Sequence, residues 1–336
     1  RPPPGDGPRV SSTAALPPVA QPMAPLLAAC ERRMREAVAG HASEVVHPAA
    51  DTLAAGGKRV RPLLVFCAAP RRALVHPETR DALLSAAAAV ELVHMATLVH
   101  DDLLDGAPMR RGRPTVAEAL GPERAVSTGD FLFARAFGEL TRTRSARAVQ
   151  ALAAAALDLS RGELDQQRAA FDLSLTEADY LARCRRKTAA LFAVACRLGA
   201  LVGGAGEEAA ERLAGFGENV GMAFQIFDDI LDLAGAPAET GKRRGTDLCD
   251  GTVTLPVILA LRLEPGLRPH VAEACQGPAL EHLCDRLARH PALEIARERA
   301  LGFVAAARRA IQEAPSDGAD VAALREIADG VVDRYS

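Results

Sequence analysis

Apolar residues recur every three to four positions along most of the chain, and this spacing predicts α-helices rather than strands. The segments with this helical pattern are 83–105, 146–170, 177–203, 207–234, 252–263 and 294–312. Glycine and proline pairs or clusters, typical of loops between helices, interrupt the pattern at 56–57, 106–108, 121–122, 203–204 and 235–245. Alternating patterns typical of strands are nearly absent, so the sequence predicts an all-α fold.

The beginning of the chain differs in composition from the rest. Residues 1–24 are rich in Pro, Gly, Ser and Ala, a composition typical of disordered segments. From residue 25 to residue 336 no linker or change of composition divides the helical pattern. We therefore expect a tail at 1–24 and a single domain at 25–336.

Length and charge exclude several classes of protein. The 336 residues, 49% of them hydrophobic, are enough to bury a large core. A formal net charge of -3 argues against a nucleic-acid partner. No apolar run reaches the ~20 residues of a membrane-spanning helix, so we expect no integral membrane segment. The seven cysteines form no CxxC pair, which predicts buried thiols in a reducing cytoplasm rather than disulfides or a zinc site.

Two clusters of aspartate carry the strongest chemical signal. Asp101, Asp102 and Asp105 follow an apolar helical segment, and a second cluster with the same DDxxD spacing begins at Asp228 and ends at Asp232. Residues four apart on a helix lie on one face, so the first and last carboxylates of each cluster project together.

This placement of acidic residues costs free energy unless a cation compensates it. Helix C-termini repel negative charge, and like charges ~4 Å apart cost several kcal/mol at an effective dielectric near 20. Mg²⁺ typically takes one or two carboxylates together with phosphate oxygens and water. A single cluster of this kind is as often a solvated helix end, but two clusters favour Mg²⁺ ions that grip a diphosphate.

Basic segments lie on both sides of the first acidic cluster. They are GGKRVRP at 56–62 and MRRGRPT at 109–115, and the arginine fork matches phosphate oxygens. His94 lies two helical turns before Asp101 on the same face, and Lys187 with Thr188 interrupts another apolar helix. A core histidine and a snorkelling lysine are the alternative interpretations of these residues.

Taken in order, these segments resemble the all-trans isoprenyl (polyprenyl) diphosphate synthases, from about residue 25 to the C-terminus. The matching segments are GGKRVRP (56–62), HDDLLDGAPMRRGRPT (100–115), GD (129–130), RGELDQQ (161–167), KTAALF (187–192), FQIFDDILD (224–232), GKRRGTDL (241–248) and TLPVILAL (254–261). The resemblance implies an isoprenoid-synthase-type helical bundle around a central cavity, assembled as a homodimer. It also implies isopentenyl diphosphate and an allylic prenyl diphosphate as substrates. The implied cofactor is Mg²⁺, about three ions per active site, with Mn²⁺ as a substitute.

Carried over residue by residue, the resemblance implies a role for each group of side chains. The Mg²⁺ ligands are Asp101, Asp105 and Asp228, with Asp102 and Asp232 as supporting acids. The isopentenyl diphosphate site contains Lys58, Arg61, His94 and Arg111. Arg110, Lys187 and Lys242 contact the allylic diphosphate, and Thr188 and Gln225 lie near the developing cation. Many relatives carry a lysine where this chain has Thr252, which cannot supply that charge and leaves Lys242 to serve alone.

The predicted function is therefore sequential, Mg²⁺-dependent condensation of isopentenyl diphosphate with a farnesyl or geranylgeranyl starter. Neither Phe nor Tyr occurs between residue 86, roughly 22 Å below Asp101 on the helix, and residue 97. We predict a tunnel lined by Ala96, Thr97 and Val93 and a product of around C30 to C50, which Ala96→Phe should shorten. The alternatives are a C20 geranylgeranyl diphosphate synthase, a class I terpene cyclase and a non-catalytic regulatory subunit of a prenyl synthase.

Overall fold

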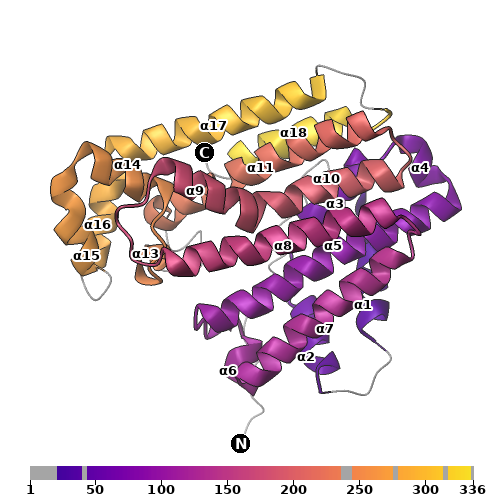
Figure 1. The fold of residues 1–336 in the computed structure, drawn as a ribbon, viewed down its shortest axis with the longest axis horizontal. Coiled ribbons are helices and arrows are strands. Elements are labelled where there is room, and N and C mark those ends of the chain that lie inside the picture. Colours follow the sequence, from indigo (N-terminus) through magenta and orange to yellow (C-terminus); the bar gives the residue numbers. More distant parts are fainter. Residues whose placement is uncertain (1–20, 40–43, 236–243, 275–278, 313–316, 334–336) are drawn as a thin grey trace, which may run out of the picture.

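A computed structural model of the chain describes residues 21–39, 44–235, 244–274, 279–312 and 317–333 (Figure 1). Lys242 and nearly all of the predicted tail at 1–24 lie outside the described residues. The six cysteines within them are free, and all except the half-buried Cys249 are buried.

The fold is a bundle of α-helices, as the sequence predicts (Figure 1). The first half contains α1 (Ala24–Val38), α2 (Val46–Ala54), α3 (Val60–Ala68), α4 (Arg71–Val75), α5 (Pro77–Leu104), α6 (Val116–Leu120), α7 (Pro122–Thr141) and α8 (Ala146–Arg168). The second half contains α9 (Glu177–Cys184), the π-helical segment η2 (Arg185–Ala189), α10 (Ala190–Val202), α11 (Glu207–Ala234), α13 (Thr246–Cys249), α14 (Leu255–Leu263), the 3-10 turn η3 (Pro265–Leu267), α15 (Arg268–Ala274), α16 (Ala279–Ala288), α17 (Pro291–Gln312) and α18 (Val321–Asp333).

Helix α10 lies at the centre of the bundle. It packs against α3, α5, α8 and α11, while α7 covers α5 and α17 covers α11. Most side chains of α10 are buried, which explains why its sequence is apolar nearly all round. Candidate site residues lie on the long helices around it, α5, α8 and α11.

Helix boundaries follow the apolar pattern closely, with differences at the ends. The predicted helix at 207–234 coincides with α11. Helix α5 begins at Pro77, six residues before the predicted start at 83, because a proline and the acidic Glu78 suit a first helical turn. Helix α14 begins at Leu255, where proline again occupies the first turn. The predicted helix at 177–203 follows one path but is interrupted by η2.

A short β-hairpin was not predicted. Strands β1 (Met109–Arg110) and β2 (Arg113–Pro114) pair antiparallel, with Arg110 opposite Arg113. The two residues that join them, Arg111 and Gly112, have φ values of 51° and 74°. Positive φ at both central positions is the geometry of a type I′ turn, which matches the twist of a two-stranded ribbon. The hairpin therefore holds the predicted basic segment in a fixed shape.

Helix α5 is longer and more apolar than the sequence analysis allowed. By length and composition alone it passes the test for a membrane-spanning helix. Within the protein, 72% of its most apolar window is buried. Its apolar side chains contact α1, α3, α7 and α10, as expected of the core helix of a bundle.

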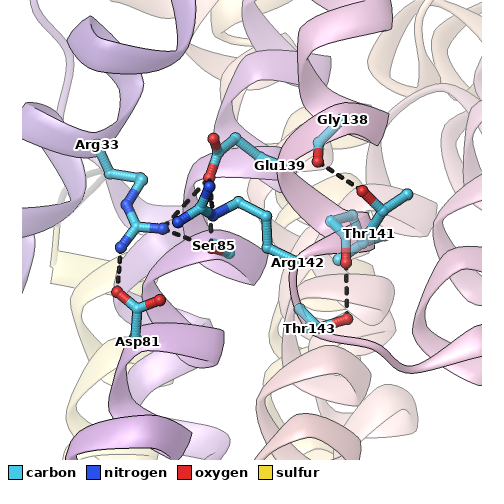
Figure 2. Close-up of polar contacts among 9 residues, drawn as sticks. Arg33, Asp81, Ser85, Gly138, Glu139, Thr141, Arg142 and Thr143 are labelled. Atoms are coloured by element: carbon cyan, nitrogen blue, oxygen red, sulfur yellow. Dashed lines mark hydrogen bonds and ion pairs between the residues drawn. The ribbon is translucent and has the colours of Figure 1, made fainter.

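A partly buried polar cluster joins α1, α5 and α7 at the end of α5 remote from Asp101 (Figure 2). Arg33 Nη1 donates to Ser85 Oγ at 2.9 Å, and that hydroxyl donates to Glu139 Oε2 at 3.3 Å. Arg33 also pairs with Asp81, and Arg142 lies 3.8 Å from the Glu139 carboxylate. The cluster satisfies its own buried charges, so it fixes how the three helices pack.

Candidate functional site

The two acidic motifs lie at the C-terminal ends of α5 and α11. Helix α5 ends at Leu104, with Asp105 as its C-cap and Gly106 in the left-handed region at φ 61°. The second motif, Asp228 to Asp232, occupies the last two turns of α11, which ends at Ala234. Both helices thus present carboxylates at the end that repels them, as the sequence analysis anticipated.

Within the first motif, the neighbouring aspartates point to different sides of α5. Asp101 lines a cavity of about 440 Å³ between α5, α7, α8 and η2. Burial raises the pKa of the Asp101 carboxyl to about 7, an effect that Lys187 opposes and Glu163 reinforces. Asp102 is only 5% exposed and accepts a 2.6 Å hydrogen bond from Arg110 Nε. A cation beside Asp101 would relieve the cost of its burial.

Within the second motif, each aspartate has a different environment. Asp228 is exposed, whereas Asp229 is 2% exposed and hydrogen-bonded to protein groups. Burial raises the pKa of the Asp229 carboxyl to about 7. The Asp232 carboxylate accepts hydrogen bonds from the backbone N–H groups of Thr246 at 3.2 Å and Asp247 at 3.3 Å, where α13 begins. Asp228 is therefore the carboxylate of this motif most open to an incoming ligand.

The carboxylates fit Mg²⁺ by their chemistry. Among the described residues, no three His, Cys, Asp or Glu side chains converge on a preformed metal cage. Mg²⁺ does not require one, because it commonly takes one or two carboxylates and completes its shell with phosphate oxygens and water. Asp101, Asp105 and Asp228 offer such hard oxygen donors at the ends of two helices.

The cavity beside Asp101 combines a charged end with apolar walls. Lys187 Nζ lies 2.5 Å from the Glu163 carboxylate, and both line the cavity with Asp101. Its apolar lining includes Leu103, Leu104, Val126, Phe133, Leu159 and Leu164. The volume is within the range of small-molecule sites. Such a cavity suits a ligand with an anionic head and a hydrocarbon body.

Two residues of this cavity, Glu163 and Gln167 on α8, were missed as site residues by the sequence analysis. The signal was available, because RGELDQQ (161–167) stood among the matching segments without a role. On a helix, residues 163 and 167 lie one turn apart on one face. Both residues of this face line the cavity.

Lys187 and Thr188 lie in the π-helical segment, which the sequence analysis did not anticipate. π-Bulges occur frequently at functional sites. Here the segment packs directly on α8 at Gly162, where a Cβ atom would lie 2.6 Å from the Lys187 backbone nitrogen. The absence of a side chain at Gly162 therefore lets Glu163 reach Lys187.

The predicted chain-length residues divide between the cavity and the core. Thr97 lines the cavity, and its Oγ1 donates to the backbone oxygen of His94 at 2.8 Å. Ala96 and Val93 are fully buried. Neither of them is among the described residues that line this cavity.

Positive charge gathers on the adjacent face of α5. Burial lowers the pKa of Arg61 to about 10, and its guanidinium lies 4.7 Å above the ring of Phe192. The pKa of His94 is well below its usual value because of burial and the nearby charges of Arg61 and Arg111. Burial and neighbouring arginines thus disfavour the charged forms of these groups, and a bound diphosphate would favour them.

Arg59 supports this basic cluster from below, a role that the sequence analysis missed. It is 7% exposed, adopts a left-handed φ of 49°, and pairs with Glu91 at 2.9 Å. It also donates to Leu53 O at 3.2 Å and lies 3.3 Å from Glu31. The neighbouring Lys58 is exposed. A buried arginine thus fixes the turn from which Lys58 and Arg61 project.

The loop that carries Thr252 is held by several contacts. Arg183 Nη2 donates to Val253 O at 2.8 Å, and Phe171 N donates to Gly251 O at 2.8 Å. The Thr252 backbone N–H donates to Asp247 O at 2.7 Å. The backbone on both sides of Thr252 is therefore held by hydrogen bonds from Arg183 and Phe171.

Comparison with known proteins is consistent across sequence and structure. Residues 43–281 match the family described as Polyprenyl synthetase. Component 2 of heptaprenyl diphosphate synthase from Geobacillus stearothermophilus is 43% identical over 252 residues, which are 75% of this chain and 77% of that protein. The fold matches heptaprenyl diphosphate synthase from Staphylococcus aureus with a TM-score of 0.86 at 29% identity, over 94% of this chain and 99% of that one. A decaprenyl diphosphate synthase from Rhodobacter capsulatus gives 0.84 at 36% identity, over 95% and 98%.

The family match spans both acidic motifs and both basic segments. The structural matches extend over nearly the whole chain. The chain therefore belongs to the polyprenyl synthetase family, the all-trans isoprenyl diphosphate synthases, and is a prenyltransferase.

Proposed function

We propose that the protein lengthens an allylic diphosphate by repeated addition of isopentenyl diphosphate, giving a product of around C30 to C50. The carrying observation is the 440 Å³ cavity, in which Asp101, Glu163 and Lys187 stand beside apolar walls. The heptaprenyl and decaprenyl synthases similar to this chain support a medium- to long-chain product over the C20 alternative.

Asp101, Asp105 and Asp228 would hold Mg²⁺, which neutralises a diphosphate and makes it a better leaving group. We expect about three ions, with Mn²⁺ as a substitute, and supporting roles for Asp102 and Asp232. Lys187, with Arg110 and Lys242, binds the allylic diphosphate. To do so, Lys187 exchanges its contact with Glu163 for one with phosphate oxygens.

The second substrate binds on the basic face of α5. Lys58, Arg61 and Arg111 hold the isopentenyl diphosphate, and a neutral His94 donates a hydrogen bond to it. The carbon–oxygen bond of the allylic diphosphate breaks, and the isopentenyl double bond forms the new carbon–carbon bond. The released diphosphate takes the proton that is lost. Thr188 and Gln225 lie near the developing positive charge, and the apolar walls exclude water.

The purified chain alone, incubated with Mg²⁺, labelled isopentenyl diphosphate and farnesyl diphosphate, is expected to give labelled products that end at about C30 or longer. A product that stops at C20 would instead favour a geranylgeranyl diphosphate synthase. No incorporation with any starter would favour the non-catalytic subunit.

We further propose that the enzyme works as an assembly of subunits. The exposed apolar side chain of Leu157 on α8, which lies outside the cavity lining, supports a contact surface there. A homodimer is one form of it. The name "component 2" of the Geobacillus stearothermophilus relative favours a second, different subunit. Light scattering on the purified chain gives the mass of the assembly, and an activity assay on the same sample tests whether it works alone. A dimer that is active alone excludes the need for a different subunit.

The six free cysteines among the described residues support a reducing compartment, and we propose the cytoplasm.

Product length is expected to respond to residue 97. Thr97→Phe places a ring in the cavity beside Asp101 and should shorten the product by at least one isoprene unit. Thr97→Val keeps the size of the side chain and should leave the product unchanged. Products sized after dephosphorylation provide the measurement. An unchanged distribution in Thr97→Phe would show that the growing chain takes another path, such as the one predicted past Ala96.

A further inference from the structure

The middle aspartate of each acidic motif faces the protein rather than the ligand side. Asp102 pairs with Arg110, and Asp229 is the more buried of the two. Asp229 Oδ2 accepts a 2.6 Å hydrogen bond from the hydroxyl of Tyr180. Its Oδ1 accepts a 2.7 Å hydrogen bond from Gln225 Nε2, one helical turn away. Both carboxylate oxygens of Asp229 are therefore engaged by side chains of the protein.

These contacts determine how the amide of Gln225 is oriented. The amide turns its nitrogen toward Asp229, since Gln225 Nε2 donates to Asp229 Oδ1. Its oxygen then faces Thr188, whose Oγ1 donates to Gln225 Oε1 at 2.6 Å. The amide nitrogen of Gln225 thus contacts Asp229, and its oxygen contacts Thr188.

The network joins three elements around the site. Tyr180 lies on α9, Thr188 on the π-helical segment beside Lys187, and Gln225 and Asp229 on α11. Tyr180 is 1% exposed, so its hydroxyl has no access to bulk water to replace Asp229. The π-helical segment packs tightly on α11 at Gly221, where a Cβ atom would lie 2.7 Å from Ala189 Cα. The four side chains thus form a rigid chain of hydrogen bonds that ends next to Lys187.

We propose that Asp229 and Tyr180 are positioning residues that hold the amide of Gln225, with its oxygen against Thr188, in the orientation that stabilises the developing positive charge. The inference rests on the proposed function, in which Thr188 and Gln225 lie near a developing positive charge. Preorganised dipoles stabilise developing charge because they need no reorientation during the reaction. An amide that rotates by half a turn would present its N–H groups instead and oppose the reaction.

Two substitutions test this role. Tyr180→Phe removes one donor to Asp229 and keeps the buried ring; we expect kcat to fall about tenfold. Asp229→Asn is expected to have a larger effect. If the asparagine oxygen accepts the hydrogen bond from Tyr180, its NH₂ group faces Gln225. The Gln225 amide must then rotate to present its oxygen to that NH₂ group. We expect kcat to fall about thirtyfold. Thr128→Val is the matched control, since Thr128 is fully buried and its Oγ1 has no hydrogen-bond partner among the described residues.

Binding separates positioning from metal ligation. In Tyr180→Phe and Asp229→Asn, the Kd for the unreactive analogue farnesyl thiodiphosphate with Mg²⁺, measured by calorimetry, should stay within about twofold of the unaltered chain. The KM for isopentenyl diphosphate should be equally unaffected. The inference would be overturned if the Kd, or the Mg²⁺ concentration needed for activity, rose in proportion to the loss of kcat. An equal loss of kcat in Thr128→Val would also overturn it.

The same measurements distinguish this inference from the proposed function. An unaltered chain that incorporates no isopentenyl diphosphate would sink the proposed function and the inference together. If the unaltered chain is active and kcat is unchanged in Tyr180→Phe and Asp229→Asn, the inference is wrong but the proposed function stands.

Discussion

Asp101→Ala is expected to lower kcat by about 1,000-fold or more while leaving the folded protein at least as stable. The loss follows because this carboxylate lines the cavity at the charged end where a diphosphate would bind, and stabilisation of a leaving group by bound cations is worth several kcal/mol. Stability should not fall, because burial already disfavours the ionised form of Asp101 and raises its pKa to about 7. Steady-state incorporation of labelled isopentenyl diphosphate and thermal denaturation measure the two effects.

Glu78→Ala provides the matched control for this prediction. Glu78 is an exposed acid in the first turn of the same helix, at the end opposite Asp101. We expect it to keep full activity and to lose a few tenths of a kcal/mol of stability from its interaction with the helix dipole. Activity within tenfold of the unaltered chain in Asp101→Ala would contradict the role of the first motif.

The helices and the position of the acidic motifs could be predicted from the sequence because both depend on local spacing. Apolar periodicity located α11 to the residue, since Gly206 and Gly235 interrupt the pattern at both of its ends. The same helical geometry placed the first and third aspartates of each motif on one face. It also contained a signal that the sequence analysis did not use: each residue advances about 100° around a helix, so a middle aspartate must point elsewhere.

Other features depend on contacts between distant segments and left no local signal. The ion pair of Arg59 with Glu91 joins residues 32 apart, and neither type of residue is ordinarily buried. The π-helical segment at Arg185–Ala189 has an unremarkable helical composition, and its geometry is seen only where it packs against α8 and α11. Sequence analysis therefore located Lys187 as a candidate, whereas its partner Glu163 required the fold.

The contact between α8 and the π-helical segment leads to the second large expected effect. Gly162 lies where the two backbones meet, with Lys187 N at 2.6 Å and Lys187 Cα at 2.9 Å from the position of an added Cβ. Neither neighbour is the flexible end of a side chain, so an added methyl group must push α8 and the segment apart. Glu163 and Lys187, which pair across this contact, would separate with them.

Gly162→Ala is therefore expected to lower kcat about 100-fold and to destabilise the protein by about 1–3 kcal/mol, a drop of several degrees in Tm. Glycine to alanine inside a helix ordinarily stabilises by about 0.5–1 kcal/mol, which makes the direction of the change diagnostic. Gly138→Ala in α7 tests that baseline, since an added Cβ there meets nothing within 4 Å. Equal gains in Tm for both variants, with unchanged kcat, would show that the two backbones separate without cost and that the Lys187 contact does not depend on Gly162.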